Sequence, residues 1–182
     1  IAVIGYTYGL SIAAGEANPF NYFGYFTNQT STLMALILIG TGVVGLRGRR
    51  SPAWLTLARA VATSCMVIVG VIYNVLVPGT GSAPLWVSVI LHILFPAYVL
   101  LDWFLVGDRP ALSWRQLWLV APFPLLWLAV VLLRGITDGW VPYGFLLPVN
   151  GPVSLVLHVA GLLAALGAAG ALVWGGSRVR GI

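Results

Sequence analysis

Six runs of predominantly apolar residues, most of them about 20 residues long, dominate this chain. A helix needs about 20 apolar residues to cross the hydrocarbon core of a bilayer. Only 7% of the residues are charged, whereas a soluble domain has about 25% and places them towards water. The sequence therefore predicts an all-α, polytopic membrane protein with one domain of six transmembrane helices. The predicted spans cover residues from about 1–14, 27–46, 54–77, 84–106, 114–133 and 152–174.

The first run is too short to cross a bilayer, so we expect residues that precede Ile1 to complete it. The arginines predict how the helices are oriented. All nine basic residues are arginines, and Arg134 alone lies in a loop on one side of the predicted bundle. Arg59, just inside the third span, can extend towards the opposite side. Because short cytoplasmic loops are enriched in basic residues, we expect both ends of the chain to be cytoplasmic. The other arginines on that side are Arg47, Arg49, Arg50, Arg109, Arg115, Arg178 and Arg180.

The same arginines bear on partners and location. In a soluble protein, a net charge of +5 would favour nucleic acid. Here the arginines lie in short loops between apolar runs, so we expect membrane lipids and no nucleic acid as partners. Arginine without lysine, together with much alanine, glycine, leucine and valine, is typical of a GC-rich bacterial genome. The sequence therefore predicts a multi-pass protein of the bacterial inner membrane.

Polar side chains gather towards the outer ends of the predicted spans, and each needs a reason because its burial in lipid is costly. His92 lies about 10 Å inside the fourth span, at a rise of about 1.5 Å per residue, and His158 lies at a similar depth in the sixth. We predict a polar pocket that opens to the outer leaflet. The alternative is a set of unrelated polar residues, each hydrogen-bonded locally. The candidates are Thr27, Asn28, Asn74, His92, Arg134 and His158.

Other residues carry structural predictions. Asp102 lies about 15 Å from His92 along the helix, so we expect it to pair with an arginine near the inner interface. Pro96 is expected to kink the fourth span, and Asn74 to form a hydrogen bond between helices. Tryptophans near the span ends are expected to form belts at the two interfaces. They are Trp54, Trp86, Trp103, Trp114, Trp140 and Trp174.

Three parts of the chain, and its layout as a whole, resemble a known family. That family is the androgen-induced and androgen-dependent membrane proteins, with their bacterial relatives. Bacterial relatives tend to carry Tyr-Pro-Tyr-Pro-Phe in the last outer loop, and Val141 and Gly144 depart from that pattern. The segments that carry the resemblance are residues 21–31 (NYFGYFTNQTS), 91–96 (LHILFP) with 101–103 (LDW), and 134–145, which includes Trp140 to Phe145 (WVPYGF).

The resemblance implies an activity. Characterised animal members of the family are six-helix intramembrane hydrolases that cleave esters of fatty acids with hydroxy fatty acids, using a threonine nucleophile and a histidine. It implies that Thr27 is the nucleophile and His92 the general base, with no metal and no organic cofactor. Arg134 would then bind a fatty-acid carboxylate, and His158 would orient His92 or bind the substrate's head. Further hydrogen-bond donors would be Asn28 and Asn74.

Two other functions remain open from the residues themselves. A lone threonine in a membrane helix usually hydrogen-bonds back to its own helix, so Thr27 also has a purely structural interpretation. A non-enzymatic lipid-binding or transport protein would use the same outer pocket without a nucleophile. Haem ligation by His92 and His158 is a third interpretation, whereas two histidines alone are an incomplete ligand set for zinc.

Overall fold

The computed structural model describes residues 1–81, 83–107 and 109–179, and all regular elements among them are helical. The prediction of an all-α protein is confirmed. Arg180, one of the predicted cytoplasmic arginines, lies outside the described residues. The elements are α1 (Ala2–Ala13), α2 (Pro19–Tyr22), α3 (Phe26–Leu46), α4 (Ala53–Leu76), α5 (Leu85–Val89), η1 (Ile90–Leu94), α6 (Phe95–Leu105), η2 (Trp114–Val120), α7 (Pro122–Thr137), η3 (Gly144–Leu146), η4 (Pro148–Asn150) and α8 (Pro152–Gly176).

Within the described residues, five helices are long and apolar enough to cross a membrane, so the chain is a multi-pass membrane protein. Their outer faces carry exposed leucines such as Leu36, Leu126 and Leu157, which are 55%, 67% and 66% exposed. Such a surface suits lipid tails, which are as apolar as leucine. The apolar helix α1 has only 12 residues. The five long helices are Phe26–Leu46, Ala53–Leu76, Leu85–Leu105, Trp114–Thr137 and Pro152–Gly176.

The fifth predicted span differs most from the structure. We expected it to end near Leu133, but α7 continues to Thr137. The charge of Arg134 does not end the helix, because its guanidinium pairs with Asp138 one turn later, with N–O distances of 2.9 and 2.8 Å. Oppositely charged residues four apart lie on the same face of a helix and support it.

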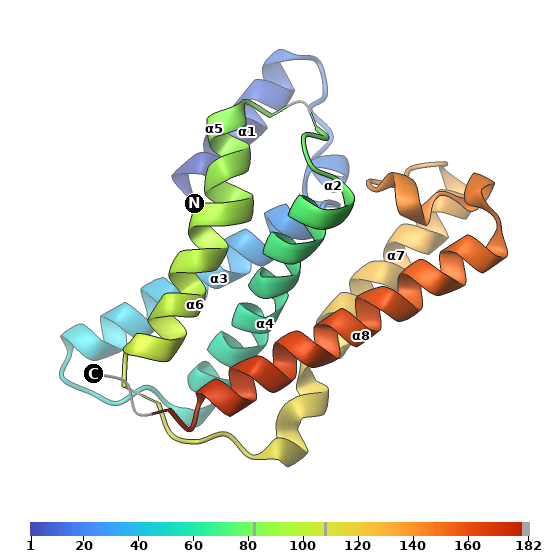
Figure 1. Cartoon of the computed structure of the whole chain (residues 1–182). Helices are drawn as coiled ribbons and strands as arrows, with labels where there is room; N and C mark the ends of the chain where they lie inside the picture. The colour runs from blue at the N-terminus through green and yellow to red at the C-terminus, as the bar shows by residue number, and fades with distance from the viewer. Residues whose placement is uncertain (82, 108, 180–182) are drawn as a thin grey trace.

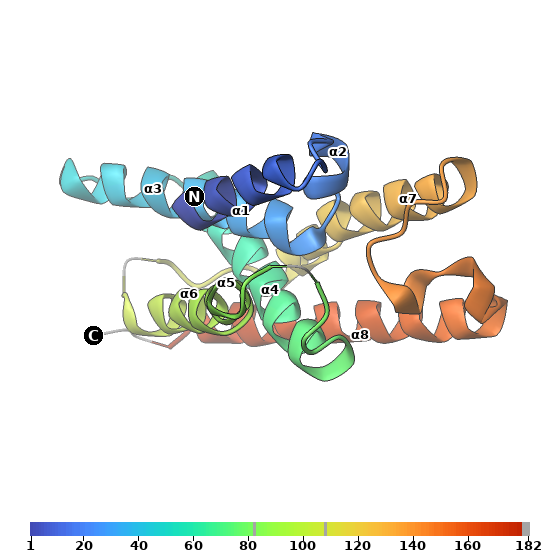
Figure 2. The same cartoon turned by 90° about the horizontal axis from the view of Figure 1, so that it is seen from above.

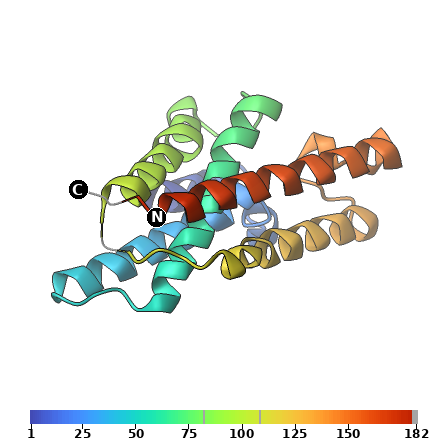
Figure 3. The same ribbon diagram turned by 60° about the horizontal axis from the view of Figure 1, so that its bottom comes forward.

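The helices form two layers with α4 passing obliquely between them (Figure 2). Helices α1, α3 and α7 lie in one layer, and α5, α6 and α8 lie in the other. Helices α7 and α8 extend together to one side of α4, whereas α3 and α6 extend to the opposite side (Figures 1 and 3). The N-terminal end of α3 and the C-terminal end of α4 therefore approach the α7–α8 pair, and the candidate site lies there.

The core is built around α4. Its residues Ala60, Ala62, Thr63 and Met66 are fully buried, and its small side chains allow the neighbouring helices to approach closely. Such packing drives helix association in lipid, where apolar burial itself contributes little. The central position of α4 therefore follows from its run of small residues.

Two tryptophans near span ends belong to the core. Trp103 of α6 and Trp174 of α8 have no exposed surface. Their indole N–H groups donate to the carbonyls of Val173 and Ser113 at 2.9 and 3.0 Å. The prediction that these two tryptophans lie in an interfacial belt is therefore wrong, because both indoles find a hydrogen-bond partner inside the protein. Trp54, by contrast, is 69% exposed.

The predicted pairing of Asp102 with an arginine is confirmed. Its carboxylate lies 2.5 Å from the guanidinium of Arg59 on α4, and the two side chains are 16% and 4% exposed. The guanidinium of Arg59 also lies over the ring of Trp103 at 5.6 Å. The ion pair joins α4 to α6 at the end of the bundle opposite the candidate site.

Candidate functional site

Thr27 lies in the first turn of α3, directly after a chain reversal. Tyr25 precedes the helix in an extended conformation, and its carbonyl accepts the N–H groups of Asn28 and Gln29. The side-chain amide of Asn28 donates to the carbonyl of Tyr22 at 2.8 Å. Asn28 therefore fixes the entry to α3 by a local hydrogen bond, which places Thr27 at a defined point beside α4 and η1.

His92 lies in the middle of η1, a π-helical stretch that joins α5 to α6. The N–H of Phe95 bonds to the carbonyl of Ile90, five residues earlier. The π turn lies just before Pro96, the residue at which we predicted a kink of the fourth span. Such π turns are rare and are frequent at functional sites.

Asn74 supports the backbone at His92. Because Pro96 has no N–H, it cannot donate to the carbonyl of His92, which lies four residues earlier. The side-chain amide of Asn74 donates to that carbonyl at 3.1 Å and to the carbonyl of Gly70 at 2.8 Å. The predicted hydrogen bond between helices is therefore confirmed, and it binds a carbonyl to which Pro96 cannot donate.

The structure brings Thr27 and His92 together although 65 positions separate them. The hydroxyl of Thr27 lies 3.4 Å from Nε2 of His92. On the other side of the ring, Nδ1 lies 3.0 Å from the carbonyl of Ser88. A carbonyl only accepts, so Nδ1 carries the proton and Nε2 keeps its lone pair towards Thr27. The ring of Tyr73 stacks on the imidazole at a centroid distance of 3.5 Å.

Tyr143, in the loop between α7 and α8, completes the surroundings of Thr27. Tyr143 lines the same apolar groove as Thr27. Its ring meets the rings of Tyr25 and Trp127 edge-on, at 6.0 and 5.8 Å. Burial raises the pKa of Tyr143 to about 12. The phenol therefore stays protonated at neutral pH.

An apolar groove with a cavity volume of about 70 Å³, part of it open to the outside, begins at Thr27 and runs between α4, α7 and α8. No charged side chain lines it among the described residues. Leu125 of α7 and Leu163 of α8 line the groove and are 43% and 40% exposed. The groove therefore suits an uncharged, apolar group. Representative lining residues are Ile68, Ile72, Leu128, Leu162 and Leu166.

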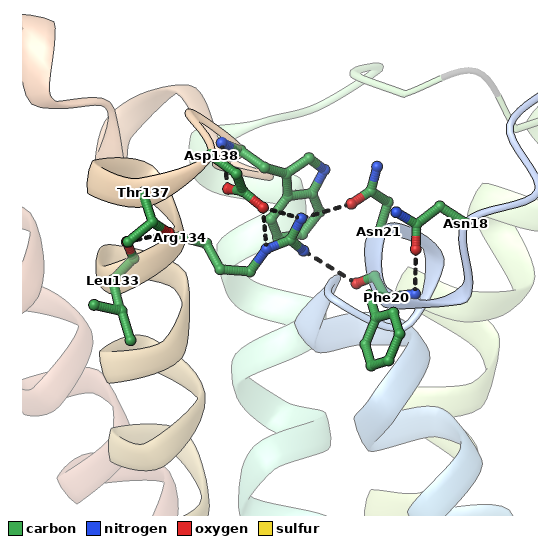
Figure 4. A network of polar contacts seen from close by, with 8 residues as sticks. Asn18, Phe20, Asn21, Leu133, Arg134, Thr137 and Asp138 are labelled. Atoms are coloured by element: carbon green, nitrogen blue, oxygen red, sulfur yellow. Dashed lines mark hydrogen bonds and ion pairs between the residues drawn. The ribbon is translucent and has the colours of Figure 1, made fainter.

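Arg134 takes part in a network at the C-terminal end of α7 (Figure 4). Its guanidinium pairs with Asp138 and donates to the side chain of Asn21 at 2.8 Å and to the carbonyl of Phe20 at 3.3 Å. It also lies over the ring of Trp140 at 4.2 Å. The guanidinium holds the pKa of the Asp138 carboxyl below its usual value, mainly through the hydrogen bond. Arg134 therefore ties α7 to the segment around α2.

His158 of α8 lies near the site but is bonded to its own helix. Its Nδ1 lies 2.8 Å from the carbonyl of Ser154, one turn earlier. Its ring stacks on Phe145 with a centroid distance of 5.5 Å, and Phe145 lines the groove. In the described part of the chain, no hydrogen bond or ring contact joins His158 to His92.

The sequence had singled out Thr27, Asn28, Asn74 and His92, and the structure gathers them at one end of the bundle. Helical spacing places Ser88 on the face of His92, four residues earlier, and Tyr143 belongs to the last outer loop, which borders the predicted pocket. Tyr73 was not foreseen as a neighbour of the pair, because nothing local distinguishes it. Comparisons of the chain with protein-family models, with curated proteins and with solved structures returned no match.

Proposed function

We propose that this protein is an intramembrane hydrolase of lipid esters, with Thr27 as nucleophile and His92 as general base. The observation that carries the proposal is the 3.4 Å approach of Thr27 Oγ1 to His92 Nε2, with Nδ1 held by the carbonyl of Ser88. A hydroxyl, a base and a group that orients the base are the parts of an activated nucleophile. Hydrogen bonds of this kind are often long before substrate binds.

The chemistry follows from that arrangement. His92 Nε2 takes the proton of the Thr27 hydroxyl as Oγ1 attacks the ester carbonyl, and the ester's alcohol leaves with a proton from His92. The acyl group stays on Thr27 until water, activated by the same Nε2, attacks it and releases the fatty acid. Every step uses protons and oxygens of the substrate, the water and these two side chains, so the reaction needs no metal and no organic cofactor.

The apolar groove supports a long-chain substrate. It starts at Thr27, and its exposed leucines open it towards the surrounding lipid between α7 and α8. We therefore propose a fatty-acyl ester that enters from the bilayer, with esters of fatty acids and hydroxy fatty acids as the first class to test. We do not assign the carboxylate of such a substrate to Arg134, whose donors already bind Asp138, Asn21 and Phe20.

The same proposal includes the position of the chain in the membrane. We propose six crossings, with α1 as part of the first, and both ends of the chain in the cytoplasm of a bacterial inner membrane. The arginines support this orientation, because they concentrate at the ends of the helices opposite the Thr27–His92 pair. The pair then faces the outer leaflet.

The test is hydrolysis of a panel of long-chain esters by purified protein in detergent. We expect turnover by the intact protein and a loss of at least about 1000-fold in Thr27→Ala and His92→Ala, because residues that act as one unit each cost most of the rate. Thr41→Ala is the matched control, since its hydroxyl bonds to the carbonyl of Ile37 in the same helix, away from the site.

Labelling by a fluorophosphonate probe gives a second reading of the nucleophile. We expect labelling of the intact protein and of Thr41→Ala but not of Thr27→Ala. Full labelling in both Thr27→Ala and His92→Ala would refute the mechanism. If the intact protein turns over no ester while lipid co-purifies with it, the non-enzymatic lipid-binding function takes first place, because the groove needs no nucleophile to hold an acyl chain.

A further inference from the structure

The ring of Tyr73 covers one face of the His92 imidazole. The two rings are nearly parallel, with 8° between their planes and 3.5 Å between their centroids. This distance is close to the optimal separation of about 3.5–4.0 Å between non-bonded carbon atoms, so the rings lie face to face with almost no offset. Tyr73 also lines the apolar groove, together with Thr27. The phenol ring therefore contacts the proposed base and also faces the groove proposed to hold the substrate.

A close approach of α4 to η1 makes this stacking possible. Gly70 lies in α4, three residues before Tyr73. A Cβ added at Gly70 would lie 3.2 Å from Cβ of Pro96 and 3.5 Å from the carbonyl oxygen of His92. Glycine therefore leaves the space in which the two helices approach. Asn74, which follows Tyr73, donates to the same carbonyl at 3.1 Å. Helix α4 thus contacts both the backbone and the ring of His92.

Two contacts together fix the orientation of the imidazole. Nδ1 donates to the carbonyl of Ser88 at 3.0 Å, which fixes one direction in the ring but leaves rotation about that hydrogen bond open. The stacked ring of Tyr73 fixes the plane of the imidazole. With both contacts in place, Nε2 stays directed at the hydroxyl of Thr27, 3.4 Å away. Such precision matters, because a misplacement of about 1 Å can lower a rate by about 100-fold.

The face-to-face geometry also favours the charged form of the imidazole. Two neutral aromatic rings prefer an offset or edge-to-face arrangement, because the negative faces of their π systems repel each other. A cation, in contrast, is attracted to the face of an aromatic ring. When Thr27 Oγ1 bonds to the ester carbonyl carbon, its proton moves to His92 Nε2, and the ring is a cation until that proton passes to the leaving alcohol. The attraction is therefore stronger in the transition state than in the ground state, and only such interactions raise kcat.

We propose that Tyr73 is a positioning residue, whose aromatic ring fixes the plane of His92 and stabilises the imidazolium that forms as Thr27 attacks. This inference rests on the proposed hydrolase function, in which His92 is the general base. The contact is made by the ring of Tyr73, so the role belongs to the ring and not to the hydroxyl. Phenylalanine should therefore replace Tyr73, whereas an aliphatic side chain should not.

The test compares Tyr73→Phe, which keeps the ring, with Tyr73→Leu and Tyr73→Met, which keep an apolar side chain but no ring. Turnover of the best ester from the panel is measured beside the intact protein and Thr27→Ala. We expect Tyr73→Phe to keep kcat within about threefold and both non-aromatic variants to lose about 10-fold or more. KM should change less than about threefold in all of them, because the lining stays apolar. The matched control is Tyr98→Leu, because Tyr98 is 56% exposed on α6.

Proton NMR of the histidine side chains measures the stacking without turnover. The chain has two histidines, so His158→Gln assigns the two sets of signals. An aromatic ring shields protons that lie over its face. We therefore expect upfield signals for the His92 ring in the intact protein and in Tyr73→Phe, and a downfield shift in Tyr73→Leu and Tyr73→Met. Signals that stay unchanged in the non-aromatic variants would contradict the stacking.

The variants and their unfolding midpoints in detergent separate the possible outcomes. A lower kcat in a folded non-aromatic variant, with kcat kept by Tyr73→Phe, supports the role of Tyr73. Full turnover by Tyr73→Leu or Tyr73→Met, an equal loss in Tyr73→Phe, or a loss that matches a fall in the unfolding midpoint overturns it. If the intact protein is active and Thr27→Ala is not, these results overturn the role of Tyr73 alone. If the intact protein hydrolyses no ester, the proposed function itself fails, and the role of Tyr73 fails with it.

Discussion

The ion pair between Arg59 and Asp102 offers a sharp test of the packing. Both side chains lie inside the bundle, with 4% and 16% exposed surface and a shortest N–O distance of 2.5 Å. The perturbation is Asp102→Leu, which leaves the Arg59 guanidinium beside an apolar side chain. The matched second variant is Arg59→Leu with Asp102→Leu, which removes both charges and keeps apolar volume at the contact.

The structure sets the expected magnitude. Breaking a buried ion pair from one side costs about 3–5 kcal/mol. Arg59 retains its contact with the Trp103 ring, and it lies in the second turn of α4, from which a long side chain can reach the interface. We therefore expect Asp102→Leu to cost about 2–3 kcal/mol, below that full range. The double variant should lie within about 1 kcal/mol of the intact protein, because replacing a whole buried pair by apolar residues is often neutral.

The assay is reversible unfolding in mixed micelles, with the fraction of sodium dodecyl sulfate as the denaturing variable and tryptophan fluorescence as the signal. Asp138→Asn serves as a comparison, because that carboxylate pairs with Arg134 at an exposed site, where an ion pair contributes little. The reasoning is refuted if Asp102→Leu unfolds like the intact protein, or if the double variant is as unstable as the single one.

Two further predictions concern the supports of the site. Asn74→Leu should lower the free energy of unfolding by about 1 kcal/mol and should lower ester turnover. This loss of stability should be smaller in a Pro96→Ala background, where a backbone N–H is restored. An equal loss in both backgrounds would contradict the explanation. Gly24→Ala should lower the free energy of unfolding by about 1–3 kcal/mol, because an added Cβ would lie 2.2 Å from the ring of Trp140. The control is Gly42→Ala, where an added Cβ meets nothing within 4 Å. Equal stability of the two variants would refute the clash.

Membrane insertion is the property that the sequence predicted most completely. Whether a segment can cross the bilayer depends on its own length and hydrophobicity, which are set by residues adjacent in the sequence. The residue bounds of the five long helices accordingly agree closely with those of five of the predicted runs. Errors arose where a side chain's partner decided the outcome. Arg134 extends α7 because Asp138 neutralises it, and Trp103 is buried because a carbonyl of α8 accepts its N–H.

For the site as well, the sequence indicated individual residues, whereas the tertiary structure decided their contacts. The sequence singled out Thr27 and His92 because a polar residue in an apolar span needs a reason, and it placed both towards the outer side. That they approach within 3.4 Å, and that Tyr143 lines the same groove as Thr27 from the loop after α7, depends on how α3, η1 and the α7–α8 pair pack around α4. A span is stable by its own composition, whereas a contact between spans requires the crossing angles and rotations of several helices at once, so only the tertiary structure decides it.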